Sequence, residues 1–418
     1  MSEEIMRLKQ QRETALEIQK QRLEELLPQL MKASGLDMWL VICREDNDDP
    51  VLPSLLPAVL SADCSTVLPP TAETIMLVFY LCPDGSMERL ALSSLDPGPL
   101  YQRPWDMEED QWQALAGLVK ERNPERIGIN SSELFAHADG LSHTLRLKLE
   151  QALDDQFRSR LTSAEALAVS WLETRTVREL ELYPRLIQAA HKIIAEAFSS
   201  RVTTPGQTQI PDIGWWMRQK IRDLGMQAWF HPMIQVRRQG VRHPLDSGPV
   251  VAGDMLFCDL GLRWLGLNSD TQQLAYVLHP GETEAPQGLR RGMALANGVQ
   301  DMMTEKISVG VAGNVILDSV RKQAQPQGIE CYISTHPIGS FGHGPGPAIG
   351  VWNRQKGVPG RGDYAVKDNT CYALELCVVC PVEQWDGQRI VFNLEETIAV
   401  AHGKVKYLNG RQTAFHLI

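Results

Sequence analysis

GDMLFCDLGLRWLGLNSD, residues 253–270, places Asp259 within one apolar, strand-like run and Asp270 at the start of the next. Asp259 lies inside a predicted buried strand, where an ionised carboxylate is costly unless it is paired or bound to a metal ion. Asp270 begins the next predicted strand. An antiparallel hairpin with its midpoint between Trp264 and Leu265 would put the two carboxylates directly opposite each other. Because opposed like charges destabilise a sheet, the pattern predicts a cation between them.

A second pair of predicted strands repeats this arrangement. CYALELCVVC (371–380) and IVFNLEETIAV (390–400) each hold one glutamate in an apolar setting, Glu375 and Glu395. Their midpoint is Trp385, next to an Asp-Gly dipeptide that favours a hairpin turn. Pairing with a buried arginine or capping of a helix explains any one of these acids well. Neither explanation accounts well for all four acids, which lie on two similar predicted hairpins.

Two histidines lie seven residues apart in the glycine- and proline-rich segment STHPIGSFGHGPGPAIG, residues 334–350. A loop histidine alone is more often a surface residue than a ligand, but His336 and His343 are weighed here together with four carboxylates. Four carboxylates and an imidazole exceed the needs of one zinc ion and suit two hard or borderline cations. Manganese fits these donors best, with cobalt, iron and zinc as alternatives. Two such cations can activate a water molecule and polarise a carbonyl group for hydrolysis.

Five residues resemble, in type and order, the metal ligands of the M24 metallopeptidases: Asp259, Asp270, His336, Glu375 and Glu395. This family includes methionine aminopeptidases, Xaa-Pro aminopeptidases, prolidases and creatinase. The gap between the two aspartates is typical of the family, and His343 falls on its second histidine. The resemblance covers the whole chain. It implies a creatinase-type α/β N-terminal domain at residues 1–160 and an α+β "pita-bread" catalytic domain at residues 161–418.

The resemblance also implies roles for individual residues. Glu375 matches a glutamate that both binds metal and acts as the general base. His343 and His243 match histidines that orient the substrate and stabilise the oxyanion, and His231 in WFHP is a rival of His243 for that role. Arg238, in the basic segment QVRRQGVRH, is a candidate for binding a substrate carboxylate, although a solvated basic turn is the simpler explanation.

Two departures from the family pattern lie near the expected substrate pocket. His343 is followed by Gly344 instead of an acid, and Asn393 stands where the last motif usually begins with arginine. We therefore expect a two-metal exopeptidase that hydrolyses an N-terminal Xaa-Pro or similar peptide bond, with proline specificity left open. The alternatives are a creatinase-like hydrolase of a small C–N compound and a non-catalytic binding protein. Retention of all five ligands counts against both alternatives.

The remaining elements follow from hydrophobic periodicity. The first 160 residues predict an α/β domain with a largely parallel sheet. Helices are predicted at 5–33, 108–122, 140–154, 176–200, 208–224, 285–307 and 312–325, and further strands at 37–43, 74–82 and 126–130.

Composition and charge limit the partners. The net charge of −10 and pI of about 5.6 argue against binding of a nucleic-acid backbone. The sequence has no apolar run long enough for a membrane span, and its N-terminus lacks the apolar core of a signal peptide. Eight scattered cysteines are typical of reduced thiols, so a cytoplasmic location is expected. The family resemblance implies a homodimer acting on small peptides.

Overall fold

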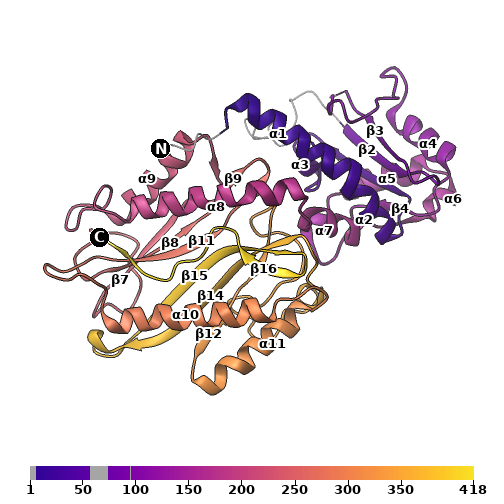
Figure 1. The fold of residues 1–418 in the computed structure, drawn as a ribbon. Helices are drawn as coiled ribbons and strands as arrows, with labels where there is room; N and C mark the ends of the chain where they lie inside the picture. Colours follow the sequence, from indigo (N-terminus) through magenta and orange to yellow (C-terminus); the bar gives the residue numbers. More distant parts are fainter. Residues whose placement is uncertain (1–5, 57–73, 95) are drawn as a thin grey trace. The chain divides into compact units, whose positions relative to one another are not determined.

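The computed structural model describes residues 6–56, 74–94 and 96–418, which form two compact units, Met1–Leu172 and Glu173–Ile418 (Figure 1). The division falls after Leu172, whereas the sequence pattern placed the domain boundary at residue 160. The difference arises because β5, Leu161–Ser163, pairs with the sheet of the first unit. Trp171 also packs inside that unit, with its ring centroid 6.5 Å from that of Trp39.

The first unit is built on a five-stranded sheet in the order β3-β2-β1-β4-β5. Its strands are β1 (Met38–Arg44), β2 (Thr74–Leu81), β3 (Met87–Leu92), β4 (Ile127–Ile129) and β5. The β1–β4 and β4–β5 pairs are parallel, but β2 runs antiparallel to both β1 and β3, so the expected largely parallel sheet is a mixed one. The unpredicted strand β3 follows a tight turn in which Gly85 has a φ of 87°.

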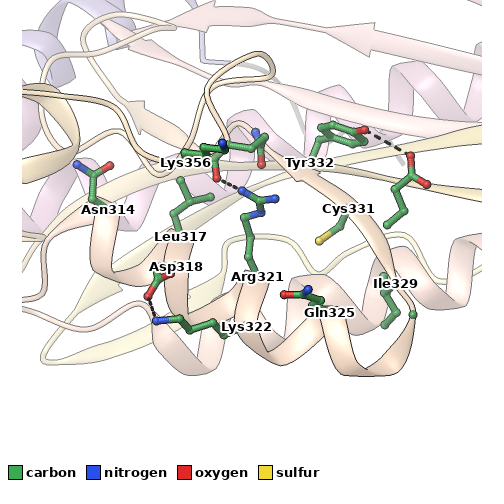
Figure 2. A pocket seen from close by; sticks show the side chains of 13 residues that line it. Asn314, Leu317, Asp318, Arg321, Lys322, Gln325, Ile329, Cys331, Tyr332 and Lys356 are labelled. Atoms are coloured by element: carbon green, nitrogen blue, oxygen red, sulfur yellow. Dashed lines mark hydrogen bonds and ion pairs between the residues drawn. The ribbon is translucent and has the colours of Figure 1, made fainter.

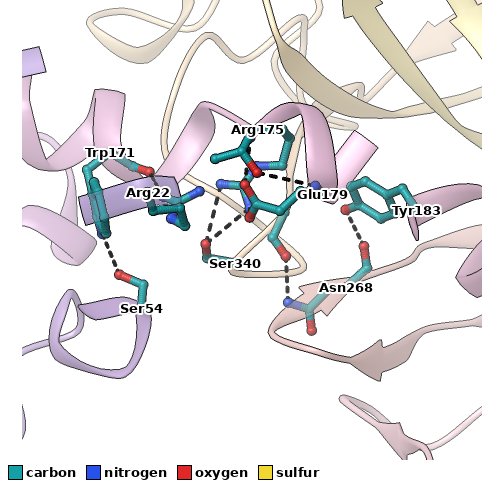
Figure 3. Close-up of polar contacts among 10 residues, drawn as sticks. Arg22, Ser54, Trp171, Arg175, Glu179, Tyr183, Asn268 and Ser340 are labelled. Atoms are coloured by element: carbon teal, nitrogen blue, oxygen red, sulfur yellow. Dashed lines mark hydrogen bonds and ion pairs between the residues drawn. The ribbon is translucent and has the colours of Figure 1, made fainter. Parts of the chain in front are cut away.

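The three helices predicted for the first unit are present, together with further helices that the sequence pattern did not predict. The long N-terminal helix begins at Leu8 and continues through a π-helical turn, and residue 5, where the prediction started it, lies outside the described part of the chain. The guanidinium of Arg22 in that turn lies 4.2 Å from the centroid of the Trp171 ring, whose Nε1 donates to Ser54 at 2.7 Å (Figure 3). The helices are α1 (Leu8–Gln21), the π turn (Arg22–Leu26), α2 (Leu27–Ser34), α3 (Leu52–Leu55), α4 (Gln111–Arg122), α5 (His143–Ala152), α6 (Asp155–Arg158) and α7 (Glu165–Glu173).

The second unit is built on a nine-stranded sheet whose main path is β12-β14-β15-β11-β8-β7, with a three-stranded sheet beside it. The strands of the large sheet are β7 (Met233–Arg237), β8 (Met255–Leu260), β11 (Thr271–Tyr276), β12 (Glu330–Ile333), β13 (His336–Ile338), β14 (Thr370–Val382), β15 (Gln388–Ala401), β16 (Lys404–Tyr407) and β17 (His416–Leu417). The small sheet contains β6 (Gln227–Ala228), β9 (Leu262–Trp264) and β10 (Leu267–Asn268).

Four long helices accompany this sheet (Figure 1). They are α8 (Val177–Ala197), α9 (Ile210–Asp223), α10 (Gln287–Lys306) and α11 (Gly313–Ala324). Together with the mixed sheet, these elements confirm the expected α/β N-terminal and α+β catalytic architecture. Among the described residues, no helix combines the length and hydropathy needed to cross a membrane.

The long β14–β15 hairpin has one apolar face and one face with carboxylates. Leu374, Leu376 and Phe392 are buried in the core that includes α10. The Phe392 ring lies so close to Gly292 of α10 that a Cβ there would approach it to 2.2 Å. Because successive side chains of a strand point to opposite faces, Glu375 is directed away from this core.

The first hairpin has a register different from the predicted one. Leu265 and Gly266 both have positive φ, 51° and 77°, so they form the two central residues of the turn. The turn therefore lies one residue further along than expected. As a result Asp259 faces Gln272 instead of Asp270. The sequence-based prediction of direct opposition was wrong because nothing marked Leu265 as a left-handed residue.

The C-terminal segment completes the sheet beside β11. The side-chain amide of Gln412 accepts from Leu274 N at 2.8 Å and donates to Leu274 O at 2.7 Å, in place of a neighbouring strand. Its own backbone N–H donates to Glu396 of β15 at 3.1 Å. Beyond this clamp, β17 pairs in parallel with β11. Gln412 thus fixes the spacing between the two central strands.

Replacing Gln412 with alanine should destabilise the second unit by roughly 2–4 kcal/mol, because the buried N–H and C=O of Leu274 lose their partners. Urea unfolding of the full chain measures this change. Gln327→Ala is the matched control, since Gln327 is exposed and donates only to Gln323 O within the same region. Equal free energies of unfolding for the two variants would show that the hydrogen bonds from Gln412 to Leu274 do not stabilise the sheet.

Candidate metal centre

Four polar side chains form a row across four adjacent strands. Asp259 on β8 faces Gln272 on β11, which faces Glu395 on β15, which faces Glu375 on β14. Directly opposed residues of a sheet point to the same face, so the row presents three carboxylates and one amide together. The predicted opposition of Glu375 and Glu395 is confirmed by this register.

Asp270, His336 and His343 meet the same row. Oxygen atoms of Asp259, Asp270 and Glu395 all lie within 4.8 Å of one another, and so do ligand atoms of Asp270 and the two histidines. His336 Nε2 is 3.8 Å from Asp270 Oδ2 and 3.7 Å from Glu395 Oε1. The structure therefore brings together every residue that the sequence suggested as a metal ligand, and adds His343 to the group.

The cluster is electrostatically incomplete as it stands. Burial, followed by the charge of Glu375, raises the pKa of Asp259 to about 7. Burial and neighbouring carboxylates also raise the pKa of Asp270 and Glu395, and burial raises that of Glu375. Several ligand atoms of the cluster are buried without any hydrogen-bond partner, namely Asp259 Oδ1, Asp270 Oδ1, both Glu395 carboxylate oxygens and His336 Nε2. Buried acceptors of this kind need a proton or a cation.

These donors fit a pair of divalent cations. His336 Nδ1 lies 3.2 Å from Pro337 O and can only donate to that carbonyl, which leaves the lone pair of Nε2 free for a metal. Burial lowers the pKa of His336 to about 3, so the ring is neutral, as a ligand must be. The remaining donors are carboxylate oxygens, which hard and borderline cations prefer.

The loop that carries His343 is anchored on two sides (Figure 3). Both terminal nitrogens of Arg175, a buried residue paired with Glu179, lie 3.4 Å from Ser340 Oγ. Asn268 donates to Gly339 O at 2.8 Å through its side chain, and its own carbonyl accepts from Tyr183 at 2.5 Å. The loop is therefore tied to the start of α8 and to the first hairpin.

Trp229 forms a wall beside His343. The two rings are 5.3 Å apart and nearly perpendicular. Trp229 Nε1 donates to Ser269 O at 2.8 Å, and the indole fits against Gly261 and Gly342 so closely that a Cβ at either position would lie within 2.5 Å of it. Both glycines are therefore required for the position of this aromatic wall.

Three predicted substrate residues are not brought to the cluster by any contact in the described residues. His243 is exposed in the segment between β7 and β8. The ring of His231 packs against Trp215 of α9, with ring centroids 4.7 Å apart and planes tilted by 56°. Arg238 forms a double ion pair with the buried Asp254, at 2.7 and 2.8 Å, and also donates to Pro249 O. These contacts occupy its guanidinium, and the substrate-binding role expected of Arg238 stays a prediction.

Two residues near the cluster were missed by the sequence interpretation. Gln272 occupies the row itself and could have been found, because it lies two positions after Asp270 on the same strand face. Arg361 lowers the pKa of both His336 and His343 through its charge, after burial in each case, and its Nε is buried without a partner. It comes from the short 3-10 helix Arg361–Asp363, and no spacing rule connects it with the ligands.

A cavity outside the cluster offers fewer unpartnered polar groups. It encloses about 650 Å³ between α11 and β12 (Figure 2). Its polar side chains largely satisfy one another: Lys322 pairs with Asp318 at 2.7 Å, Tyr332 bonds to Glu330, and Arg321 donates to a backbone carbonyl. The carboxylate cluster is therefore the better candidate for a functional site.

Comparison with known families agrees with this site. The sequence description of metallopeptidase family M24 matches residues 185–402, a span that contains the whole cluster. The chain belongs to metallopeptidase family M24. Comparison with curated protein sequences gave no match.

Solved structures share the fold over nearly the whole chain. X-Pro aminopeptidase from Thermotoga maritima matches with a TM-score of 0.65 at 12% identity, covering 93% of this chain and 100% of its own. Xaa-Pro dipeptidase from Bacillus anthracis matches with a TM-score of 0.63 at 14% identity, covering 97% and 100%. The N-terminal domain of FACT complex subunit SPT16 from Cicer arietinum matches with a TM-score of 0.58 at 12% identity, covering 96% and 98%. At these identities the likeness establishes the fold alone.

The metal-free protein should lose stability as the pH rises from about 4 to about 7. The folded pKa of Asp259 is about 7 against an ordinary value of 3.8, so the folded state keeps a proton that the unfolded chain has already released. At pH 8, manganese at a hundred times its Kd should add about 2.7 kcal/mol, or about 5–10 °C in Tm.

Thermal unfolding of chelator-treated and manganese-loaded protein between pH 4.5 and 8 tests this expectation. Asp259→Asn is the control. It removes one titrating carboxyl group, so the unfolding temperature of the metal-free variant should depend less on pH. Identical curves with and without manganese at pH 8 would show that the cluster does not bind the metal.

Proposed function

We propose that this chain is a dinuclear metal-dependent exopeptidase that hydrolyses a short peptide at an N-terminal Xaa-Pro or similar bond. The observation that carries the proposal is the convergence of five ligand residues, Asp259, Asp270, His336, Glu375 and Glu395. All of them except Glu375 have a buried acceptor atom without a hydrogen-bond partner. Membership of family M24 supports peptide hydrolysis, and the structural neighbours named as X-Pro peptidases favour the proline branch. Manganese remains the favoured metal because most donors are carboxylate oxygens.

The side chains around the cluster have separate tasks in this proposal. When bound, the two cations lower the pKa of water and polarise the scissile carbonyl. Glu375 accepts the proton of the attacking water and returns it to the leaving amine. Its Oε1 accepts a hydrogen bond from Gln272 at 2.9 Å, which keeps the carboxylate oriented. His343, at the edge of the cluster, donates to the developing oxyanion.

Arg361 is the basic residue that we assign to the substrate carboxylate, in place of Arg238. No carboxylate pairs with its guanidinium among the described residues, and its charge acts on both histidines of the site. A free C-terminal carboxylate close to the scissile bond is a feature of dipeptides. Together with the aromatic wall of Trp229, Arg361 therefore favours a short substrate with an apolar residue beside the bond.

A creatinase-like C–N hydrolase and a non-catalytic binding protein are the alternatives considered from the sequence. Both are disfavoured by the complete ligand set, since neither requires five converging metal donors. A cytoplasmic homodimer remains the expectation from the sequence and the family resemblance.

Metal-stripped protein should release the N-terminal residue from Xaa-Pro di- and tripeptides only after manganese is added. Replacing Glu375 with glutamine should lower kcat by about 10²–10⁴-fold, because the proton acceptor is lost. Glu305→Gln, on the exposed side of α10, is the control and should leave the rate unchanged. If manganese binds but no Xaa-Pro peptide is cut, the metal centre stands and the substrate assignment fails.

Replacing Arg361 with methionine should raise KM for a dipeptide by about 10–100-fold, since a charge-assisted hydrogen bond to a carboxylate contributes about 1.5–3 kcal/mol. The C-terminal amide of the same dipeptide should be much less affected. Arg354→Met, at an exposed position of the same loop region, is the matched control. An equal rise in KM for the acid and the amide would contradict carboxylate binding by Arg361.

A further inference from the structure

Gln272 is the one uncharged member of the row that crosses the metal centre. It lies between Asp259 on one side and Glu395 on the other and is only 3% exposed. Its Nε2 donates to Glu375 Oε1 at 2.9 Å and lies 3.4 Å from Asp259 Oδ2. Its Oε1 is buried and has no hydrogen-bond partner.

The orientation of this amide follows from its neighbours. Turning the amide over would place Oε1 against the carboxylate oxygens of Asp259 and Glu375, which repel it. The donor end therefore faces those two carboxylates, and the acceptor end is left buried beside them without a partner. Both oxygens of the adjacent Glu395 are also buried without a partner. Because Gln272 and Glu395 face each other across β11 and β15, unpartnered acceptors occur on two neighbouring residues of the row, an arrangement that is complementary to a cation.

We propose that Gln272 Oε1 is a further oxygen ligand of the metal centre, in addition to the five family ligands. This inference rests on the metal centre of the proposed function but not on its peptide chemistry. A neutral oxygen raises the number of donors without adding a fifth negative charge to a cluster that already repels itself. Because zinc is usually four-coordinate and manganese takes more oxygen ligands, Gln272 makes the centre selective for manganese over zinc.

Two variants separate the oxygen of Gln272 from its N–H groups. Gln272→Met has a similar length but neither an oxygen nor a donor, whereas Gln272→Glu keeps an oxygen ligand and removes the donor. A ligand role requires that Gln272→Met weakens manganese binding and that Gln272→Glu preserves it. A role limited to holding Asp259 and Glu375 through Nε2 requires that both variants are equally impaired.

Gln273 is the matched control on the same strand. Its amide is fully used on the other side of β11, donating to Glu396 at 3.2 Å and accepting from His416 at 2.8 Å. Gln273→Met therefore removes an equally buried amide without touching the row. It should lower the unfolding temperature without changing the ratio of manganese to zinc affinity.

Titration calorimetry of the metal-free full-length chain with manganese and with zinc tests the inference. Gln272→Met should weaken manganese binding by about 10–100-fold and zinc binding by less than about threefold. Gln272→Glu should bind manganese within about threefold of the unchanged protein. The electron paramagnetic resonance spectrum of bound manganese should change in Gln272→Met and not in Gln273→Met.

Equal weakening of both metals in Gln272→Met, or loss of manganese binding in Gln272→Glu, would overturn the ligand role while leaving the proposed function intact. Failure of the unchanged protein to bind either metal would overturn both. If Gln272→Met does not fold, Gln272→Asn replaces it. The asparagine side chain is one methylene group shorter, so its amide oxygen does not reach the position of Gln272 Oε1. Gln272→Asn is expected to show the same loss of manganese selectivity.

Discussion

The opposition of Glu375 and Glu395 across the β14–β15 hairpin is the constraint on which the centre depends. Their register is fixed by the pairing of two long strands and by the apolar face that packs against α10, so the two glutamates stay on the same face of the sheet. Opposed, buried like charges destabilise such a pair. The fold therefore places repelling carboxylates together at one position, and a cation bound there would offset the repulsion.

Two consecutive glutamates show that this cost is specific to the site. Glu396, next to Glu395, is also buried, but both of its carboxylate oxygens have partners: His191 at 2.7 Å on one, and Gln273 and the backbone N–H of Gln412 on the other. Neither oxygen of Glu395 has a hydrogen-bond partner. Hydrogen-bond donors therefore contact the carboxylate of Glu396 on one face of β15, but none contacts the carboxylate of Glu395 on the other face. Incomplete packing does not explain that contrast, whereas a cation site does.

The sequence predicted the parts of this arrangement that depend on strand periodicity. The position of Trp385 was enough to place Glu375 opposite Glu395, because the hairpin is long and its register is regular. The first hairpin was misplaced by one residue because its turn puts Leu265 in a left-handed conformation, which leucine rarely adopts. The shift by one turn position moves the partner of Asp259 by two residues, so Asp270 stayed on the same face and the ligand set survived the error. Arg361 lies in an irregular segment, where no periodicity relates sequence position to spatial position.

The backbone alone does not decide what this chain does. The same fold, at nearly the same identity, occurs in proteins named as X-Pro peptidases and in a domain of the FACT complex subunit SPT16. What can distinguish such proteins is the set of polar atoms placed on the sheet. In this chain the set contains five converging metal donors, an uncommitted arginine and an amide oxygen without a partner. In a protein with this fold and no bound metal or substrate, each of these groups would lower the free energy of unfolding, because buried polar groups without partners destabilise the folded state. Their presence together is what supports the proposed metal binding and the proposed charged substrate, so the proposed function rests on these side chains and not on the fold alone.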